Sequence, residues 1–119
     1  MAANRLRVYG ITNCDTVKRA RAWLGEHAVR YDWVDFRANP PSRDDLSRWS
    51  RAAGWDRLLN RRGTTWRTLD REQQARVQDE ASAIAMMLER PTLIKRPVIE
   101  TGDEVLVGFD AGDYARRFD

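Results

Sequence analysis

The sequence predicts an α/β fold in which a βαβ unit and a ββα unit flank a block of helices. Residues 6–11 form an apolar run and residues 31–36 alternate aromatic or aliphatic with acidic side chains, and an amphipathic segment separates these two strand patterns. Residues 38–90 carry helical patterns. Strand patterns return in residues 97–109, before a short closing helix. We expect a single domain, 1–119, in which the helical block 38–90 is an insertion.

The first part of the chain is expected to fold as strand, helix and strand. The first strand is Leu6–Ile11, and the helix after it frays at Gly25–Ala28, where His27 is expected to lie exposed, without a catalytic role. The second strand is Tyr31–Phe36. Strands joined by a helix of this length pair in parallel through a right-handed crossover. The apolar face of the helix repeats at three- and four-residue spacing, at Val17, Ala20, Leu24 and Ala28.

The helical block begins after a pair of prolines. Ser42 and Asp45 have the spacing of a capping box at a helix start, and Gly54 is expected to end that helix. A short helical turn is expected at Trp55–Leu59 and a polar loop at residues 60–66. One face of the first helix of the block is formed by Leu46, Trp49, Ser50 and Ala53.

Two further helices are expected in the block. Residues 70–78 form the weaker one, with Leu69 and Val77 facing inward, and residues 79–90 form the stronger one, which Pro91 ends. The apolar stripe of the stronger helix is expected to consist of Ala81, Ile84, Ala85 and Leu88. Core packing, rather than contact with a cofactor, is expected for Met86 and Met87.

The end of the chain is expected to form a short strand, a hairpin and a helix. Leu93–Ile94 is the short strand, and the hairpin joins Pro97–Glu100 to Val105–Phe109 through a turn at Gly102–Asp103. So short a turn makes the two strands pair antiparallel. The closing helix is Ala111–Phe118. Two aromatic residues share one of its sides, Tyr114 and Phe118.

The composition limits the classes of protein to which this chain can belong. One cysteine excludes an intramolecular disulfide, and no stretch has the apolar core of a signal peptide or the roughly 20 apolar residues of a membrane span. We therefore expect a soluble, cytoplasmic protein with no membrane contact. The net charge is +3, and ten Arg stand against five Asp and Glu between Arg37 and Arg76. This excess could attract phosphate, a glutathione carboxylate or nucleic acid, but a solvated face is the simpler explanation, and nucleic acid is not an expected partner.

Cys14 lies at or just before the start of the first helix. Unpaired backbone N–H groups and the positive end of the helix dipole favour an anion there, and helix-start cysteines can have pKa values of roughly 3.5–7.5, against about 8.5 for a free cysteine. Lys18, one turn later, adds a cation. A single cysteine can instead be a small buried apolar residue. Asn13, Asp15 and Thr16, however, are turn and capping residues that rarely surround a core position, so the sequence predicts a nucleophilic thiolate.

Three stretches carry a resemblance to a known family. They are YGITNCDT at residues 9–16, LLNRRGTTWR at residues 58–67 and IKRP at residues 94–97. A βαβ half and a ββα half with a cysteine at the first helix start resemble the thioredoxin-like fold, and the helical insertion resembles the arsenate reductase (ArsC) and Spx superfamily. The three stretches together resemble its YffB-like branch. The resemblance runs from about Arg7 to Phe118 and implies an ArsC-like fold with thiol redox chemistry.

The resemblance also implies roles for single residues. It implies a cis peptide bond between Arg96 and Pro97 beside the cysteine, where the backbone could pair with an extended peptide or with glutathione. A trans proline at the start of an edge strand is the alternative. Arsenate reductases of the superfamily place three arginines around the cysteine, and here Arg96 matches one. The second falls near Asn60, where Arg61 and Arg62 are close enough to substitute in principle, and the third falls near Gly108, which offers no charge and so disfavours arsenate reduction. Spx-type regulators carry a Cys-x-x-Cys switch, whose second position is Val17 here.

The leading hypothesis is a glutathione-dependent monothiol thiol-disulfide reductase with Cys14 as the catalytic nucleophile. A mixed disulfide formed by a lone cysteine must be resolved by an outside thiol, and glutathione is the abundant cytosolic candidate for this co-substrate. No metal is expected, and the expected partners are glutathione or a small oxidised substrate, or else a protein. The residues expected to bind substrate or glutathione are Asn13, Lys18, Arg62, Arg96 and Pro97.

Other interpretations remain open at this stage. The second hypothesis is a non-enzymatic, Spx-like regulator that binds RNA polymerase or another protein through the helical block, and the third is an arsenate reductase. Structural roles are also open for the binding residues: Asn13 can be a turn former, Lys18 and Arg62 can be solvated, and Arg96 can pair with Asp15 or Asp35.

Overall fold

The structure, a computed structural model, describes residues 6–102 and 104–118. The chain forms two compact units. One, here called the sheet unit, is built from the chain up to Asn39 and from Arg96 onward, and the other, the helical unit, is Pro40–Lys95. Each is described by itself.

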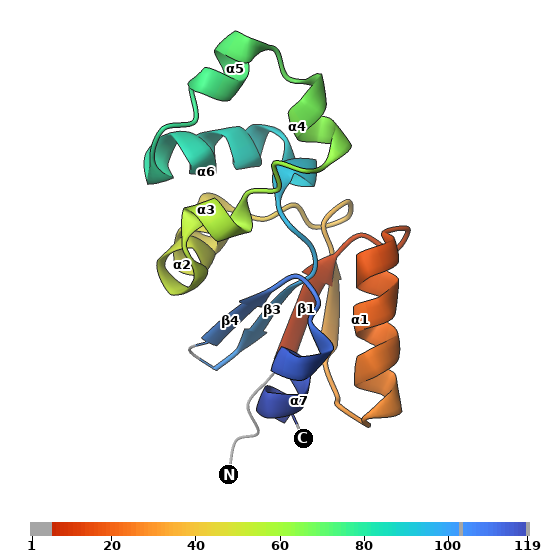
Figure 1. Cartoon of the computed structure of the whole chain (residues 1–119). Coiled ribbons are helices and arrows are strands. Elements are labelled where there is room, and N and C mark those ends of the chain that lie inside the picture. Colours follow the sequence, from red (N-terminus) through yellow and green to blue (C-terminus); the bar gives the residue numbers. More distant parts are fainter. Residues whose placement is uncertain (1–5, 103, 119) are drawn as a thin grey trace. The chain divides into compact units, whose positions relative to one another are not determined.

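The sheet unit contains a four-stranded sheet in the order β2-β1-β3-β4 (Figure 1). Its strands are β1 (Leu6–Gly10), β2 (Asp32–Asp35), β3 (Val98–Thr101) and β4 (Glu104–Val107). β1 pairs in parallel with β2 and antiparallel with β3, and β3 pairs antiparallel with β4. The expected parallel βαβ unit and antiparallel hairpin are therefore confirmed. Gly102 adopts φ 60° in the hairpin turn, and Asp103 lies outside the described residues.

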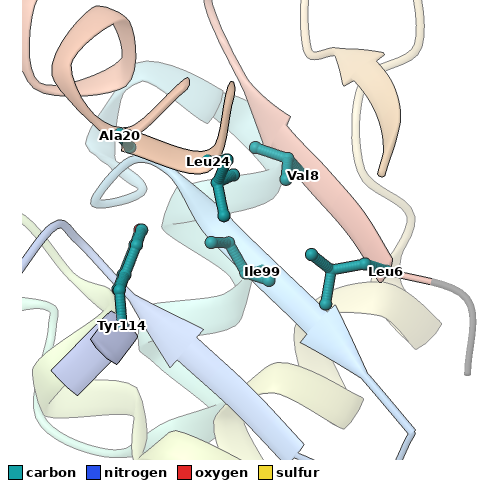
Figure 2. Close-up of a cluster of buried hydrophobic side chains, with 6 residues drawn as sticks. All are labelled: Leu6, Val8, Ala20, Leu24, Ile99 and Tyr114. Atoms are coloured by element: carbon teal, nitrogen blue, oxygen red, sulfur yellow. The ribbon is translucent and has the colours of Figure 1, made fainter. Parts of the chain in front are cut away.

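The core of the sheet unit lies between one face of the sheet and two helices, α1 (Asp15–Glu26) and α7 (Ala111–Phe118). Val8 of β1 and Ile99 of β3 are direct partners in the register, so their side chains point to this same face. Figure 2 shows α1, the strands and α7 contributing side chains to one cluster. The cluster consists of Leu6, Val8, Ala20, Leu24, Ile99 and Tyr114.

Tyr114 fixes α7 to the end of the hairpin. Its ring packs edge-on against Trp23 of α1 and against Phe109, with ring centroids 5.5 and 5.0 Å apart. Its hydroxyl donates a 2.7 Å hydrogen bond to the carbonyl oxygen of Gly108. Burial raises the pKa of this phenol well above its ordinary value, so Tyr114 remains a neutral donor. The expected aromatic side of the closing helix is confirmed, because Phe118 contacts the Tyr114 ring as well.

The helical unit consists of short helices, and a polar side chain caps the start of α2, α5 and α6. Its elements are α2 (Arg43–Ala53), α3 (Trp55–Leu58), α4 (Thr64–Thr68), α5 (Arg71–Ala75), α6 (Glu80–Glu89) and the 3₁₀ turn η1 (Pro91–Leu93). The expected capping box of Ser42 and Asp45 is confirmed, and Gly54 ends α2 with φ 93°. Ser50 of α2 donates a 2.6 Å hydrogen bond to Glu80 of α6. Leu58, Leu59 and Ile94 are buried, and an isolated bridge joins Leu59 to Ile94.

Three expectations for the helical unit were wrong. The loop expected at residues 60–66 ends earlier, because α4 begins at Thr64 after Gly63 without a side-chain cap. The strand expected at Leu93–Ile94 is a 3₁₀ turn followed by a single bridge residue. The stripe of α6 is rotated: Ala81 and Ala85 are exposed, and Ile84 is buried together with Ala83, Met86 and Met87. The expected core role of the two methionines is confirmed.

Among residues 6–102 and 104–118, no helix combines the length and the apolar character that crossing a membrane requires.

Candidate active site

Cys14 is the N-cap residue of α1. β1 ends at Gly10, and an exposed turn at Thr12 and Asn13 leads to the cysteine, which has an extended backbone with φ −99° and ψ 125°. Its N–H donates a 3.3 Å hydrogen bond to the carbonyl oxygen of Ile11, and its own carbonyl oxygen accepts the first helical bond, 2.9 Å long, from the N–H of Lys18. The thiol is partly exposed and makes no capping hydrogen bond. The predicted position of the cysteine at a helix start is thus confirmed.

A close approach of backbone and side chain sets the position of α1 against β1. A Cβ atom at Gly10 would lie 3.0 Å from Cγ2 of Val17 and 3.3 Å from the indole ring of Trp33. Val17 is fully buried one turn into α1. Because Gly10 leaves this space free, the first turn of the helix packs directly over the end of β1. This contact places Cys14 at the carboxyl end of the central strand.

Arg96 and Pro97 precede β3 at the same end of β1. Tyr9 is paired with Val98, so one further step along the antiparallel register brings Gly10 next to Pro97. The expected cis peptide bond between Arg96 and Pro97 is present. Pro97 is buried, and its carbonyl oxygen accepts a 2.8 Å hydrogen bond from the N–H of Gly108. Arg96 is partly buried, with its Nε shielded from solvent.

Arg37 is a site residue that the sequence reasoning did not single out. The pairing of β1 with β2 continues one residue further, through a 2.9 Å hydrogen bond from the N–H of Phe36 to the carbonyl oxygen of Gly10. Arg37 follows, and its Nη2 donates to Oδ1 of Asn13 at 3.4 Å. The available signal was its place directly after the second strand, because the carboxyl ends of parallel strands meet at one edge of a sheet.

The other predicted residues divide between the two units. Lys18 is exposed in α1, one turn after Cys14. Arg62 belongs to the helical unit, where it is exposed and its backbone N–H donates a 3.1 Å hydrogen bond to the side-chain oxygen of Asn60. His27 is exposed as expected and stacks on Trp23 with ring centroids 3.7 Å apart. The length of α1, about 18 Å, separates it from Cys14, so the histidine cannot act as a base for the thiol.

Two further features bear on the chemistry of the sheet unit. Tyr9 donates a 2.6 Å hydrogen bond to Glu100, and burial, together with this carboxylate, raises the pKa of the phenol. The phenol therefore stays protonated at neutral pH and has a structural role. In the part of the chain that the structure describes, no three His, Cys, Asp or Glu side chains are grouped so that they could hold a metal ion.

Comparison with known proteins gives the family. Residues 9–117 match the model of the ArsC family. The solved structure of a YffB protein has 49% sequence identity and a TM-score of 0.91, covering 96% of this chain and 99% of its own. A protein of Haemophilus influenzae is 42% identical over 113 residues, which cover 95% of this chain and 98% of that protein. The global transcriptional regulator Spx of Listeria innocua is 26% identical over 113 residues, which cover 93% and 84% of the two chains.

The similarity is continuous rather than confined to a motif. The matched residues include the β1–α1 turn with Cys14, the whole helical unit and the Arg96–Pro97 bond. The expected ArsC-like thioredoxin fold is confirmed by the close structural match to the YffB protein. The chain belongs to the ArsC family.

Proposed function

We propose that this protein is a glutathione-dependent monothiol thiol-disulfide reductase in which Cys14 is the nucleophile. The observation that carries the proposal is the state of that residue. It is the only cysteine of the chain, it begins α1, and its partly exposed thiol makes no capping hydrogen bond. A thiol placed in this way is accessible to a second molecule and lies beside the unpaired N–H groups of a helix start.

The proposed reaction exchanges disulfides in two steps. The Cys14 thiolate attacks the glutathione sulfur of a mixed disulfide RS–SG, which forms Cys14–S–SG and releases RS⁻. A glutathione thiolate then attacks the glutathione sulfur of that adduct, which releases the Cys14 thiolate and forms oxidised glutathione. The net reaction converts RS–SG and glutathione into RSH and oxidised glutathione. The second thiol has to come from outside because the chain holds no other cysteine.

Residues around the thiol have distinct roles in this proposal. Lys18 in the first turns of α1 and Arg96 at the neighbouring end of β3 supply positive charge for an anionic substrate. The backbone at Pro97 orients the peptide backbone of glutathione. Asn13 contacts the bound thiol.

The test is the glutathione adduct of Cys14. The protein is exposed to oxidised glutathione and analysed by intact mass, and then assayed for glutathione-dependent reduction of a small mixed disulfide. We expect one glutathione per chain and turnover in the native protein, and neither in Cys14→Ser. Lys95→Gln, a change at an exposed residue of the helical unit, is the matched control and keeps both properties. A native protein that is alkylated at Cys14 by iodoacetamide but forms no glutathione adduct contradicts the proposal.

A second candidate function rests on the similarity to the Spx regulator of Listeria innocua, which extends over 93% of this chain. In this alternative the helical unit docks on RNA polymerase or another protein, and Cys14 is not catalytic. The exposed arginines of residues 57–67 would supply the surface for such docking. Recovery of purified polymerase subunits by the native protein and by Cys14→Ser alike, combined with no turnover, favours this function over the reductase. Arsenate reduction is not proposed, because Asn60 and Gly108 offer no positive charge.

A further inference from the structure

We infer that Arg37 is a specificity residue that selects anionic thiols and disulfides for reaction at Cys14. The inference rests on the proposed function, because it concerns the substrates of that reaction. It adds Arg37 as a residue that prefers negatively charged substrates, a preference called the charge rule below. The ligand group would be a carboxylate carried near the reacting sulfur. Three observations support it: the position of Arg37, the weakness of its present contact, and the fact that the described residues give its exposed guanidinium no ion pair.

The backbone holds Arg37 at the rim of the cysteine turn. The β1–β2 ladder runs from Arg7 and Asp32 to Gly10 and Asp35 and continues through the Phe36 to Gly10 hydrogen bond. The N–H of Arg37 then donates a 2.8 Å hydrogen bond to Oδ1 of Asp35, which closes the turn after β2. The start of the Arg37 side chain is therefore as well fixed as the strand.

The end of the side chain is held weakly. The guanidinium is exposed, and its bond to the neutral amide oxygen of Asn13 is long, at 3.4 Å. A hydrogen bond of this length in water contributes little net free energy. A carboxylate offers two charged acceptors that match the guanidinium fork, so it replaces a neutral amide readily. Asn13 directly precedes Cys14, so the Arg37 guanidinium contacts the side chain of the residue next to the thiol-bearing residue.

The charges around Arg37 leave its cation available. The carboxylate closest along the chain, Asp35, already accepts the N–H of Arg37 itself. Within residues 6–102 and 104–118, Arg37 takes part in no ion pair. Asp15, the other nearby carboxylate along the chain, is exposed at the start of α1. Because the Arg37 guanidinium is exposed and takes part in no ion pair among the described residues, it can bind the carboxylate of a ligand.

The experiment compares two alkylating reagents that differ in charge. Iodoacetate and neutral iodoacetamide are each reacted with the whole protein under conditions in which Cys14 is the only thiol, and the ratio of their rate constants is measured. We expect Arg37→Gln to lower the iodoacetate to iodoacetamide ratio about fivefold at low ionic strength, the factor that corresponds to two unit charges about 4 Å apart in water. Added salt should shrink this difference. Arg30→Gln removes the same charge from an exposed residue before β2 and should leave the ratio unchanged.

Two more variants separate charge recognition from support of the turn. Arg37→Lys keeps the cation and should keep most of the selectivity. Asn13→Ala removes the acceptor of the Arg37 bond and should leave the selectivity in place. If Arg37 only supports the turn, Arg37→Gln will change the rates with both reagents by the same factor, and the inference is overturned.

The same variants also test the inference in disulfide exchange, although the alkylation test does not depend on that reaction. With Arg37→Gln, the rate of adduct formation at low concentrations of oxidised glutathione should fall about fivefold, while exchange with neutral bis(2-hydroxyethyl) disulfide stays unchanged. A native protein that shows the alkylation selectivity but forms no glutathione adduct contradicts the reductase and keeps the charge rule. A glutathione adduct that forms equally fast in Arg37→Gln overturns the charge rule and keeps the reductase.

Discussion

Several helices of this protein have a polar side chain that caps their first turn. One of these residues is Asp79, the N-cap residue of α6. One of its carboxylate oxygens accepts hydrogen bonds from the backbone N–H of Ser82, at 2.9 Å, and from the Ser82 hydroxyl, at 2.8 Å. These bonds lower the pKa of the carboxyl below its ordinary value, the backbone bond contributing most. The first turn of α6 thus depends on an ionised residue.

This lowered pKa predicts how stability depends on pH. A carboxyl whose pKa is depressed in the folded state contributes stability that is fully present above its unfolded pKa, about 3.9, and is lost as the pH falls through the folded value. We expect Asp79→Asn, which keeps a capping side chain, to be less stable than the native protein at pH 7. The difference in free energy of unfolding, measured in urea, should narrow as the pH is lowered below about 4. A difference that widens on acidification would contradict this interpretation.

At the scale of residues, the sequence predicted a position correctly where a single residue and its neighbours in the chain were enough to identify it. Cys14 could be placed at a helix start because a turn and an amphipathic segment flank it in the sequence. Arg37 could not be selected, because the chain holds many arginines and only the pairing of β1 with β2 shows which of them reaches Asn13. A contact between residues that are distant in the sequence has no local signature.

At the scale of elements, the contact between β1 and α1 decides where the thiol lies. Gly10 and Val17 meet so closely that a single added methyl group would reach the side chain of the helix. The packing of the first turn of α1 therefore depends on a missing side chain in the strand. Any change that separates the two elements moves the cysteine with its helix.

We expect Gly10→Ala to destabilise the protein by about 1–3 kcal/mol, the typical cost of an extra methyl group in a packed core. Val17→Ala also destabilises it, by leaving a cavity. The double variant should be more stable than the sum of the two losses predicts, because Val17→Ala removes the methyl group that the new Cβ would meet. Thermal or urea unfolding of the four proteins tests this. If the stability losses of the two single variants add strictly, the contact between the new Cβ and Val17 is relieved by movement elsewhere in the structure.

Elements with strong periodicity could be predicted, and weakly marked ones could not. The strands, α1, α2 and α7 follow from apolar spacing and caps that adjacent residues provide. α4 begins after Gly63, which has no capping side chain, so nothing in the sequence marks its start. The buried face of α6 was predicted one position off, because almost all of its residues are apolar and the long methionine side chains, rather than the alanines, fill the core.

At the scale of the whole molecule, the sheet unit is discontinuous in the sequence. β1 lies between β2, which follows it closely, and β3, which comes after the entire helical unit. One of the two ladders of β1, together with the core residues Ile99 and Tyr114, comes from the last part of the chain. The sequence could show the two halves but not that they share one sheet, a conclusion that came from the family resemblance.

This arrangement predicts that the N-terminal part of the sheet unit cannot fold alone. A chain that ends at Lys95 loses β3, β4 and α7 and should lose slow hydrogen exchange at the amides of β1, because that strand becomes an edge over an open core. A synthetic peptide of residues 96–119, added to the shortened chain, should restore part of the protection. Amides of β1 that remain protected in the shortened chain alone would contradict the prediction.

The two outer strands of the sheet have a consequence for behaviour at high concentration. β2 is short and carries a carboxylate at each end, Asp32 and Asp35. If the β2 strands of two copies joined antiparallel about their centre, Asp32 of each would face Asp35 of the other, and like charges directly opposite are unfavourable. The opposite border, β4, begins with Glu104, which Arg117 of α7 already binds. The β2 border thus opposes fibril growth by strand addition, and neutralising the two aspartates would open a path to aggregation.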